Sequence, residues 1–119
     1  NMRLYSISQA AKETNLSHHT LRYYEKSGLL PNIVKDSSGR RTYTDADLRT
    51  LKFIKALRGT NMPISQIREY GQLYLQGKKT AKERSGLLEA HREKILEEIQ
   101  KQKNYLKVIE AKIATTFDS

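Results

Sequence analysis

Residues 16–31 read LSHHTLRYYEKSGLLP, and this stretch predicts a short basic helix with a defined start and end. Ser17 is a good N-cap, because its hydroxyl can accept a hydrogen bond from the free amides of the first turn. Gly28 can adopt the left-handed conformation that ends a helix. Helical spacing turns Leu21 inward and leaves a cationic surface rich in hydrogen-bond donors. That surface comprises His18, His19, Arg22, Tyr23 and Lys26.

A first helix is expected before that stretch, over residues 5–14. Ser6 and Gln9 fit a capping box, and Asn15 is the expected C-terminal turn residue. Two short helices across a tight turn, the second carrying the basic surface, match a helix-turn-helix, in which the second helix enters the major groove. Two ordinary amphipathic helices are the alternative, because helix-turn-helix patterns are loose.

Charge is distributed unevenly along the 119 residues, which carry a formal net charge of +9. Residues 1–60 hold 11 Lys and Arg against 5 Asp and Glu, a net of +6, whereas residues 61–119 hold 11 against 8, a net of +3. The basic excess therefore lies with the helix-turn-helix and favours double-stranded DNA as a partner. An anionic membrane surface is the competing interpretation, but no helix pairs a basic face with a broad, bulky apolar one.

Composition excludes several classes of function. No apolar run is long enough to span a bilayer and no signal-peptide pattern is present, so we expect a cytoplasmic protein. The absence of Cys excludes disulfides, thiolate metal sites and thiol redox chemistry. Paired carboxylates, a nucleophile constellation and a phosphate-binding glycine loop are also missing, so we expect neither enzymatic activity nor a cofactor. Asn1 before Met2 is interpreted as the remnant of an expression tag.

Residues 33–43, IVKDSSGRRTY, predict a small β-hairpin with a Ser-Ser-Gly turn. Its tip and return strand carry Lys35, Arg40 and Arg41. Beside a recognition helix, such a hairpin is a wing that can lie along the phosphate backbone or probe the minor groove. The alternative is a solvated hairpin whose charges keep an edge strand from aggregating.

Two further helices are expected after the hairpin. Thr44 and Asp47 open a third helix, whose core stripe is Leu48, Leu51, Ile54 and Leu57. Pro63 fits the first turn of a fourth, whose inner face is Ile64, Ile67, Gly71 and Tyr74. Gly71 costs about 1 kcal/mol relative to Ala in mid-helix, so we expect a close backbone approach there, with a pocket lining as the alternative.

A long last helix is expected from a cap formed by Thr80 and Glu83 to about Thr115. About 35 residues of helix run about 50 Å, far longer than this small core needs. Apolar residues recur on it as a heptad seam, with Arg92 and Gln102 as polar interruptions. The seam comprises Leu88, Ile95, Ile99, Leu106, Ile109 and Ile113.

The seam predicts a homodimer, because a single long helix cannot bury it against its own domain. A helix that folds back on the core is the alternative. The sequence thus predicts a mostly α fold with a winged helix-turn-helix DNA-binding domain over residues 2–76 and a coiled-coil dimerisation helix over residues 80–116.

Two stretches, TLRYYEKSGLLP at residues 20–31 and GRRTYTDADLRTLKFIKALR at residues 39–58, resemble the MerR family of bacterial transcription regulators, and the match runs over nearly the whole chain. The resemblance implies a second wing from the third and fourth helices and an antiparallel coiled coil of two last helices. It also implies a pseudo-palindromic promoter, distorted so that RNA polymerase can engage it, and usually an effector. No large drug-binding domain is expected after Ser119.

The family pattern implies a set of DNA contacts in this chain. Arg22 and Tyr23 would lie on the DNA backbone or base edges, and Lys55 and Tyr70 are weaker candidates. The implied set comprises His18, His19, Thr20, Arg22, Tyr23, Lys26, Arg40, Arg41, Tyr43 and Lys55. His18 and His19 are not expected to bind a metal, because adjacent helical residues point about 100° apart and no third ligand is in view.

LKFIKALRGTNMPI, at residues 51–64, looks like the short NmlR/AdhR-like branch of the family, which responds to aldehydes and other electrophiles. The sequence departs from that branch at Ala56, where the branch carries its reactive cysteine. We therefore expect a non-covalent switch, either a small apolar ligand bound between Tyr70, Tyr74 and the coiled coil or simple changes in protein concentration. An architectural DNA-binding protein of excisionase type is the alternative function, although it has little use for a long dimerising helix.

Overall fold

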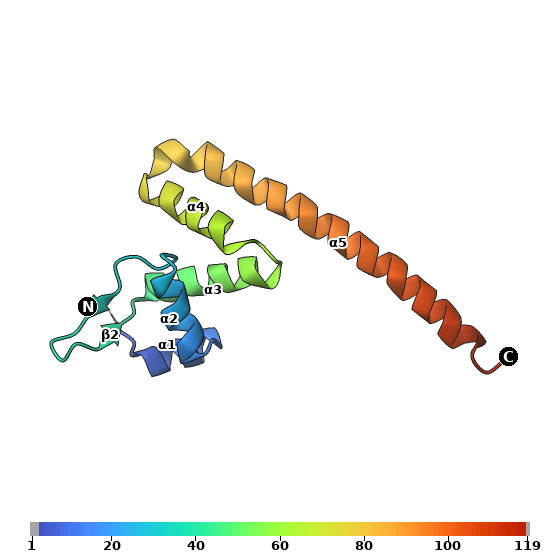
Figure 1. Cartoon of the computed structure of the whole chain (residues 1–119), viewed down its shortest axis with the longest axis horizontal. Coiled ribbons are helices and arrows are strands. Elements are labelled where there is room, and N and C mark those ends of the chain that lie inside the picture. Colours follow the sequence, from blue (N-terminus) through green and yellow to red (C-terminus); the bar gives the residue numbers. More distant parts are fainter. Residues whose placement is uncertain (1–2, 119) are drawn as a thin grey trace. The chain divides into compact units, whose positions relative to one another are not determined.

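The computed structural model describes residues 3–118, so Ser119 and the expected tag remnant at Asn1 and Met2 lie outside the described residues. The chain forms two compact units that meet at Gly77 and Lys78. In order, the elements are α1 (Ile7–Thr14), α2 (His18–Lys26), β1 (Val34–Lys35), β2 (Arg41–Thr42), α3 (Asp45–Gly59), α4 (Ile64–Leu75), the 3-10 turn η1 (Lys78–Thr80) and α5 (Ala81–Thr115) (Figure 1). The predicted mostly α fold is confirmed.

The core of the first unit is built from apolar side chains of all four of its helices and of the segments between them. Every residue of the predicted α3 stripe is buried, and Leu51 has no exposed surface. The buried apolar set is Tyr5, Ala10, Leu21, Tyr24, Leu29, Leu30, Tyr43, Leu48, Leu51, Ile54, Leu57, Met62 and Ile67. The core therefore fixes α2 by one face only and leaves its other face to solvent.

Capping residues set the starts of α1 and α3. Both predicted capping boxes are present: Ser6 with Gln9 begins α1, and Thr44 with Asp47 begins α3. The expectation that Tyr5 belongs to the first helix was wrong, because Ser6 is the N-cap and the helix begins at Ile7, two residues later than expected. Tyr5 instead forms a β-bridge with Tyr43, in which the backbone amide of each donates to the carbonyl of the other at 2.8 Å.

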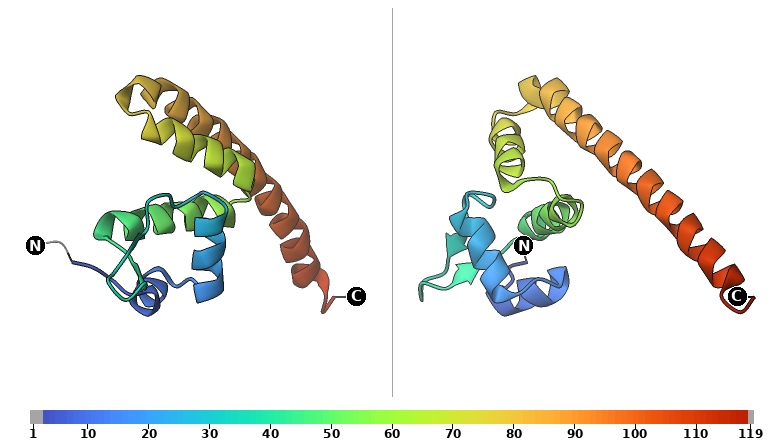
Figure 2. Two further views of the ribbon diagram at one scale, coloured as in Figure 1. Left: turned by 60° about the vertical axis from the view of Figure 1, so that its left-hand side comes forward. Right: turned by 45° about the vertical axis from the view of Figure 1, so that its right-hand side comes forward.

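The hairpin predicted at residues 33–43 is present as the antiparallel pair of β1 and β2, with Val34 opposite Thr42 and Lys35 opposite Arg41. Its turn depends on Asp36, whose carboxylate accepts from the amides of Ser38 and Arg40 at 2.9 Å each. Gly39 has φ +79°, a conformation that glycine adopts at little cost. The tip of this hairpin projects beyond the helices in the right-hand view of Figure 2.

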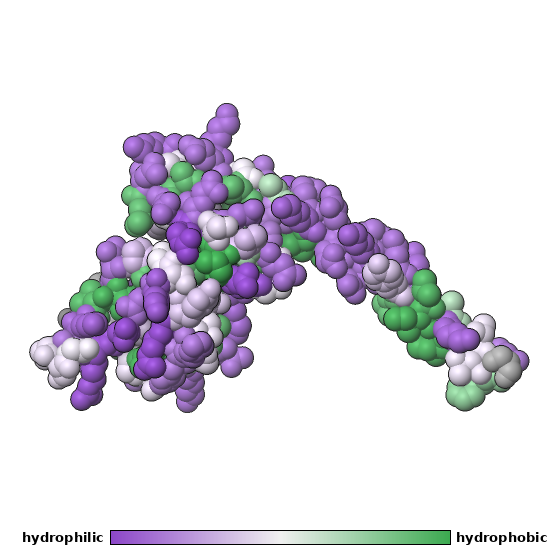
Figure 3. Space-filling view, in the orientation of Figure 1, coloured by the Kyte–Doolittle hydropathy of each residue, from purple (hydrophilic) through white to green (hydrophobic). Residues whose placement is uncertain are grey.

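The second unit consists of η1 and the 35-residue helix α5. Thr80 is the N-cap residue of α5, as predicted, but the expected side-chain cap does not form: its hydroxyl accepts instead from Arg84 Nε at 3.0 Å. Apolar side chains gather toward the C-terminal end of α5 on the face drawn in Figure 3. Within residues 3–118, no helix combines the length and apolarity needed to cross a membrane.

Gly71 is not explained by close packing, so that expectation was wrong. A Cβ placed there would have no heavy atom within 4 Å beyond its own helix and chain neighbours. The alternative holds, because Gly71 lines a cavity of about 390 Å³ between α3, α4 and the segment that follows α2. Tyr74 was wrongly assigned to the inner face of α4, since 63% of its surface is exposed at the rim of this cavity.

Two cations from α3 and α4 hold the C-terminal ends of the helix-turn-helix. Lys55 Nζ donates to the carbonyls of Thr14 at 3.1 Å and Asn15 at 3.4 Å, where α1 ends. Arg68 Nε donates to the carbonyl of Ser27 at 2.8 Å, where α2 ends. The last carbonyls of a helix lack partners within the helix and carry partial negative charge, so a cation there is stabilising.

We predict that Lys55→Met lowers the free energy of unfolding by about 1 kcal/mol, because it removes a charged donor from two helix-end carbonyls. Lys52→Met is the matched control: Lys52 is an exposed lysine of the same helix, and its replacement should change the free energy by less than about 0.5 kcal/mol. Urea unfolding at one protein concentration measures both. Equal effects of the two substitutions would contradict the assigned role of Lys55.

Candidate nucleic-acid interface

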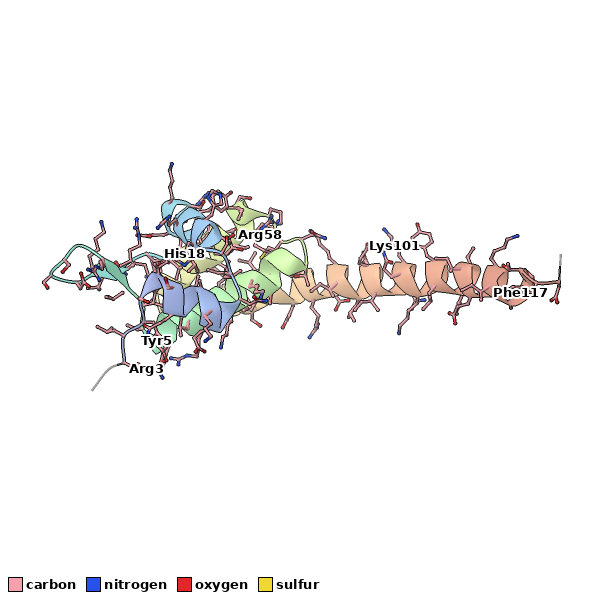
Figure 4. The ribbon with its side chains drawn as sticks, turned by 90° about the horizontal axis from the view of Figure 1, so that it is seen from below. Arg3, Tyr5, His18, Arg58, Lys101 and Phe117 are labelled. Carbon is pink, nitrogen blue, oxygen red and sulfur yellow. The ribbon has the colours of Figure 1, made fainter. Side chains whose placement is uncertain are left out.

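Helix α2 separates a buried face from an exposed basic one. Leu21 has no exposed surface and Tyr24 only 6%, whereas Tyr23 between them is 48% exposed. The helix begins at Ser17, whose hydroxyl accepts from the Thr20 amide at 3.0 Å. His18, labelled in Figure 4, lies in its first turn. The exposed side chains are those the sequence predicted: His18, His19, Arg22, Tyr23 and Lys26.

Thr20 has a structural role in addition to the one expected of it. Its hydroxyl accepts from the Ser17 hydroxyl at 2.9 Å, and its amide is the one that Ser17 caps. Replacing Thr20 would therefore disturb the start of α2. Its contact with DNA stays a prediction.

The wing is joined to α2 by one ion pair. Arg41 Nε in β2 donates to Glu25 Oε2, and both side chains are about a quarter to a third exposed, at 34% and 24%. The pair fixes the wing against α2, and it partly neutralises the charge that Arg41 would present to DNA. Arg40, the neighbouring residue, is exposed and makes no ion pair among the residues described.

The expectation that the Tyr43 side chain contacts DNA does not hold. Tyr43 has no exposed surface, because it lies in the core where the N-terminal segment pairs with the end of the wing. Its hydroxyl has no hydrogen-bond partner, and burial raises its pKa. Tyr43 therefore supports the wing from within the core.

Lys55 and Tyr70 are likewise committed to contacts within the first unit. The Lys55 ammonium lies on the carbonyls that end α1. The Tyr70 ring packs against Phe53 with centroids 5.5 Å apart. Six members of the predicted set are thus exposed, five on α2 and Arg40 on the wing, whereas Lys55 has a structural role.

Sequence reasoning missed the residues that position this surface. Glu25 was not assigned a partner, although an acidic residue amid a basic helix is a signal that it neutralises a specific cation. Tyr5 donates its hydroxyl to Asp45 Oδ1 at 2.7 Å, and this hydrogen bond raises the pKa of Tyr5. The Arg3 guanidinium lies 4.6 Å from the centre of the Tyr5 ring, and both residues are labelled in Figure 4.

The sequence matches two family models over most of its length. The model described as MerR HTH family regulatory protein matches residues 5–73, which include the whole helix-turn-helix, the wing and most of α4. A second, described as MerR, DNA binding, matches residues 48–111. This chain belongs to the MerR family. It is a MerR-type DNA-binding transcriptional regulator.

Individual MerR relatives agree with this assignment. An uncharacterized HTH-type transcriptional regulator of Haemophilus influenzae is 36% identical over 110 residues, which cover 92% of this chain and 82% of the relative. The HTH-type transcriptional regulator AdhR of Bacillus subtilis is 36% identical over 92 residues, covering 77% of this chain and 66% of AdhR.

A solved MerR structure matches the fold of nearly the whole chain. The crystal structure of HiNmlR, described as a MerR family regulator lacking the sensor domain and bound to promoter DNA, superposes with a TM-score of 0.88 at 34% identity. The match covers 98% of this chain and 92% of that one.

We predict that Tyr43→Phe raises the free energy of unfolding by about 1 kcal/mol, because it removes a buried hydroxyl that has no partner. DNA affinity should not change. Tyr5→Phe is the matched control, and it should lower the free energy by about 1 kcal/mol because it deletes the hydrogen bond to Asp45. Thermal unfolding and fluorescence anisotropy with labelled DNA measure the two properties. A large loss of DNA affinity in Tyr43→Phe would restore this residue as a contact.

Proposed function

We propose that this MerR regulator binds a pseudo-palindromic promoter as a homodimer and distorts the DNA so that RNA polymerase can engage it. The observation that carries the proposal is the exposed basic face of α2, whose cations are not neutralised by the described residues around them. HiNmlR, which shares this fold, is described as bound to promoter DNA. Because the proposed target is promoter DNA, we place the regulator in the cytoplasm.

Sequence choice should come from the first turn of α2 and from Arg22. A neutral His can donate or accept a hydrogen bond, and Arg can make a bidentate pair with guanine in the major groove. Arg40 and Lys35 on the wing are suited to phosphate, which positions the protein without selecting sequence. This division of labour supports a regulator of defined promoters over a general DNA-coating protein.

The apolar stripe of α5 supports the dimer. Four of the six seam residues, Ile99, Leu106, Ile109 and Ile113, are 45–64% exposed in the single chain, whereas Leu88 and Ile95 are partly buried. Exposed apolar surface on this scale is unfavourable in water, and pairing of two such helices removes it. Two copies related by a twofold axis would present two copies of α2 to two half-sites. An architectural protein of excisionase type has no use for this stripe.

A small non-covalent effector completes the proposal. The chain has no Cys, and Ala56, on the exposed side of α3, offers only a methyl group in place of a thiolate. A thiolate is the nucleophile that captures a soft electrophile. We therefore infer a switch that rests on non-covalent binding or on protein concentration.

Disrupting the seam tests the dimer. We predict that Ile99→Asp combined with Leu106→Asp gives folded monomers with weak operator binding, because each buried carboxylate would have to be desolvated in the paired state. The matched control is Lys94→Asp with Lys101→Asp, which has the same seven-residue spacing on another face of α5. Sedimentation velocity reads the mass, and a seam variant that stays dimeric would contradict the proposal.

Residues that contact bases and residues that contact phosphates should be distinguishable by experiment. We predict that His19→Ala relaxes sequence preference at one position per half-site, by about 1–3 kcal/mol. Arg40→Ala should weaken binding to all sequences and reduce the slope of log Kd against log salt concentration by about 1. Arg41 is unsuited to this test, because its loss also frees Glu25. Selection from a random duplex pool that returns the wild-type consensus for His19→Ala would show that His19 reads no base.

A further inference from the structure

The cavity between α3 and α4 has the dimensions and lining of a ligand site. Its volume of about 390 Å³ falls within the range of roughly 300–1,000 Å³ that small-molecule sites occupy. The lining is mostly apolar, and it includes the buried side chains of Leu30, Leu57 and Ile67. All lining residues belong to the first unit, so the site is complete within it.

Gly71 keeps this cavity open. It is a helical residue, with no left-handed φ and no close neighbour to exclude a side chain, so neither backbone strain nor packing accounts for it. A larger residue would instead project into open space at the cavity wall. Glycine is the least stabilising choice here apart from proline, so retention of the cavity is the reason for it that the first unit itself offers.

Aromatic rings in the lining indicate which class of ligand the cavity accommodates. Phe53 and Tyr70 lie with ring centroids 5.5 Å apart and planes inclined by 60°, and both line the cavity. Tyr74 and Leu75 stand at the rim, where 63% and 61% of their surfaces are exposed. Ring faces and edges arranged in this way favour an aromatic guest. Two charged residues line the cavity, Asp47 and Arg49. Their charges have opposite signs, so the lining does not select a charged guest.

The cavity wall includes parts that position the recognition helix. Leu29, Leu30 and Pro31 directly follow α2 and line the cavity. Helix α4 also lines the cavity, through Ile67 and Tyr70 among others, and its Arg68, outside the lining, donates to the carbonyl of Ser27 at the end of α2. A guest in the cavity therefore contacts both elements that fix the C-terminal end of α2.

We propose that this cavity binds a small, neutral, aromatic molecule and that occupancy shifts the position of α2 relative to α3 and α4. The inference rests on the proposed function, for which it supplies the effector site and the chemical class of the effector. The guest acts only to the extent that it binds one arrangement of these helices better than the other. No covalent step is involved.

Indole is the probe for the test, because it is neutral, bicyclic and aromatic. We expect saturable shifts of the ¹³C-methyl resonances of Leu30, Leu57, Ile67 and Leu75 when indole is added to the full chain, with the methyl groups of Ile99 and Ile109 in α5 unchanged. Gly71→Leu, which fills the cavity, should raise the Kd for indole about tenfold or more. Gln72→Leu adds the same side chain at an exposed neighbouring position and should leave the Kd within about twofold.

Three results would overturn the inference. The first is that the resonance shifts are confined to α5 or never saturate. The second is that the Kd for indole is unchanged in a folded Gly71→Leu variant. If Gly71→Leu does not fold, Gly71→Ala is the smaller substitution used for the same comparison. The third is that indole shifts the cavity resonances only in the Ile99→Asp, Leu106→Asp variant, in which the dimer is separated. That result would mean that a second copy of the chain occupies the cavity in the wild-type protein. DNA binding by the wild-type sample without indole is measured in parallel. If DNA binding is intact while indole does not bind the cavity, this inference is wrong and the proposed function is unaffected.

Discussion

Helix α2 has only nine residues, and an isolated helix of that length is marginal in water. Its position must therefore come from its neighbours. Leu21 and Tyr24 anchor one face in the core. Ser17 caps its start, and Arg68 of α4 donates to the carbonyl of the C-cap residue Ser27. The remaining elements of the first unit can be understood as supports for a short helix that must keep one entire face free.

The wing depends on the same principle. Two strands of two residues each cannot form a stable hairpin alone. They are held by the Glu25–Arg41 pair on one side and by the backbone pairing of Tyr5 with Tyr43 on the other. A partly exposed ion pair contributes little to overall stability, yet it fixes the direction of a hairpin that has few other contacts. The wing and α2 are thus oriented by each other.

Local signals in the sequence predicted much of this fold, and long-range contacts account for what it did not predict. The capping pairs at Ser6 and Thr44 and the turn at Asn15 are encoded within a few residues, and they were predicted correctly. Thr80 matched the same pattern but lies in a 3-10 turn, whose geometry gives its hydroxyl a different partner. Burial of Tyr43 and the 41-residue separation between Thr14 and Lys55 depend on tertiary packing, which periodicity does not reveal. The outer face of α2 was predictable because a helix with one buried side leaves the other exposed.

The outward side chains of α2 are independent of the fold. His18, His19, Arg22 and Lys26 make no side-chain hydrogen bond or ion pair to the other residues that the structure describes. Substitutions there therefore have little effect on folding, whereas those at Leu21, Tyr24 or Glu25 do. After a gene duplication, a copy of this regulator could drift toward a different operator one residue at a time while remaining folded throughout. Because the residues that fold α2 differ from those on its outer face, new DNA targets can be acquired without loss of folding, both by natural selection and by directed evolution.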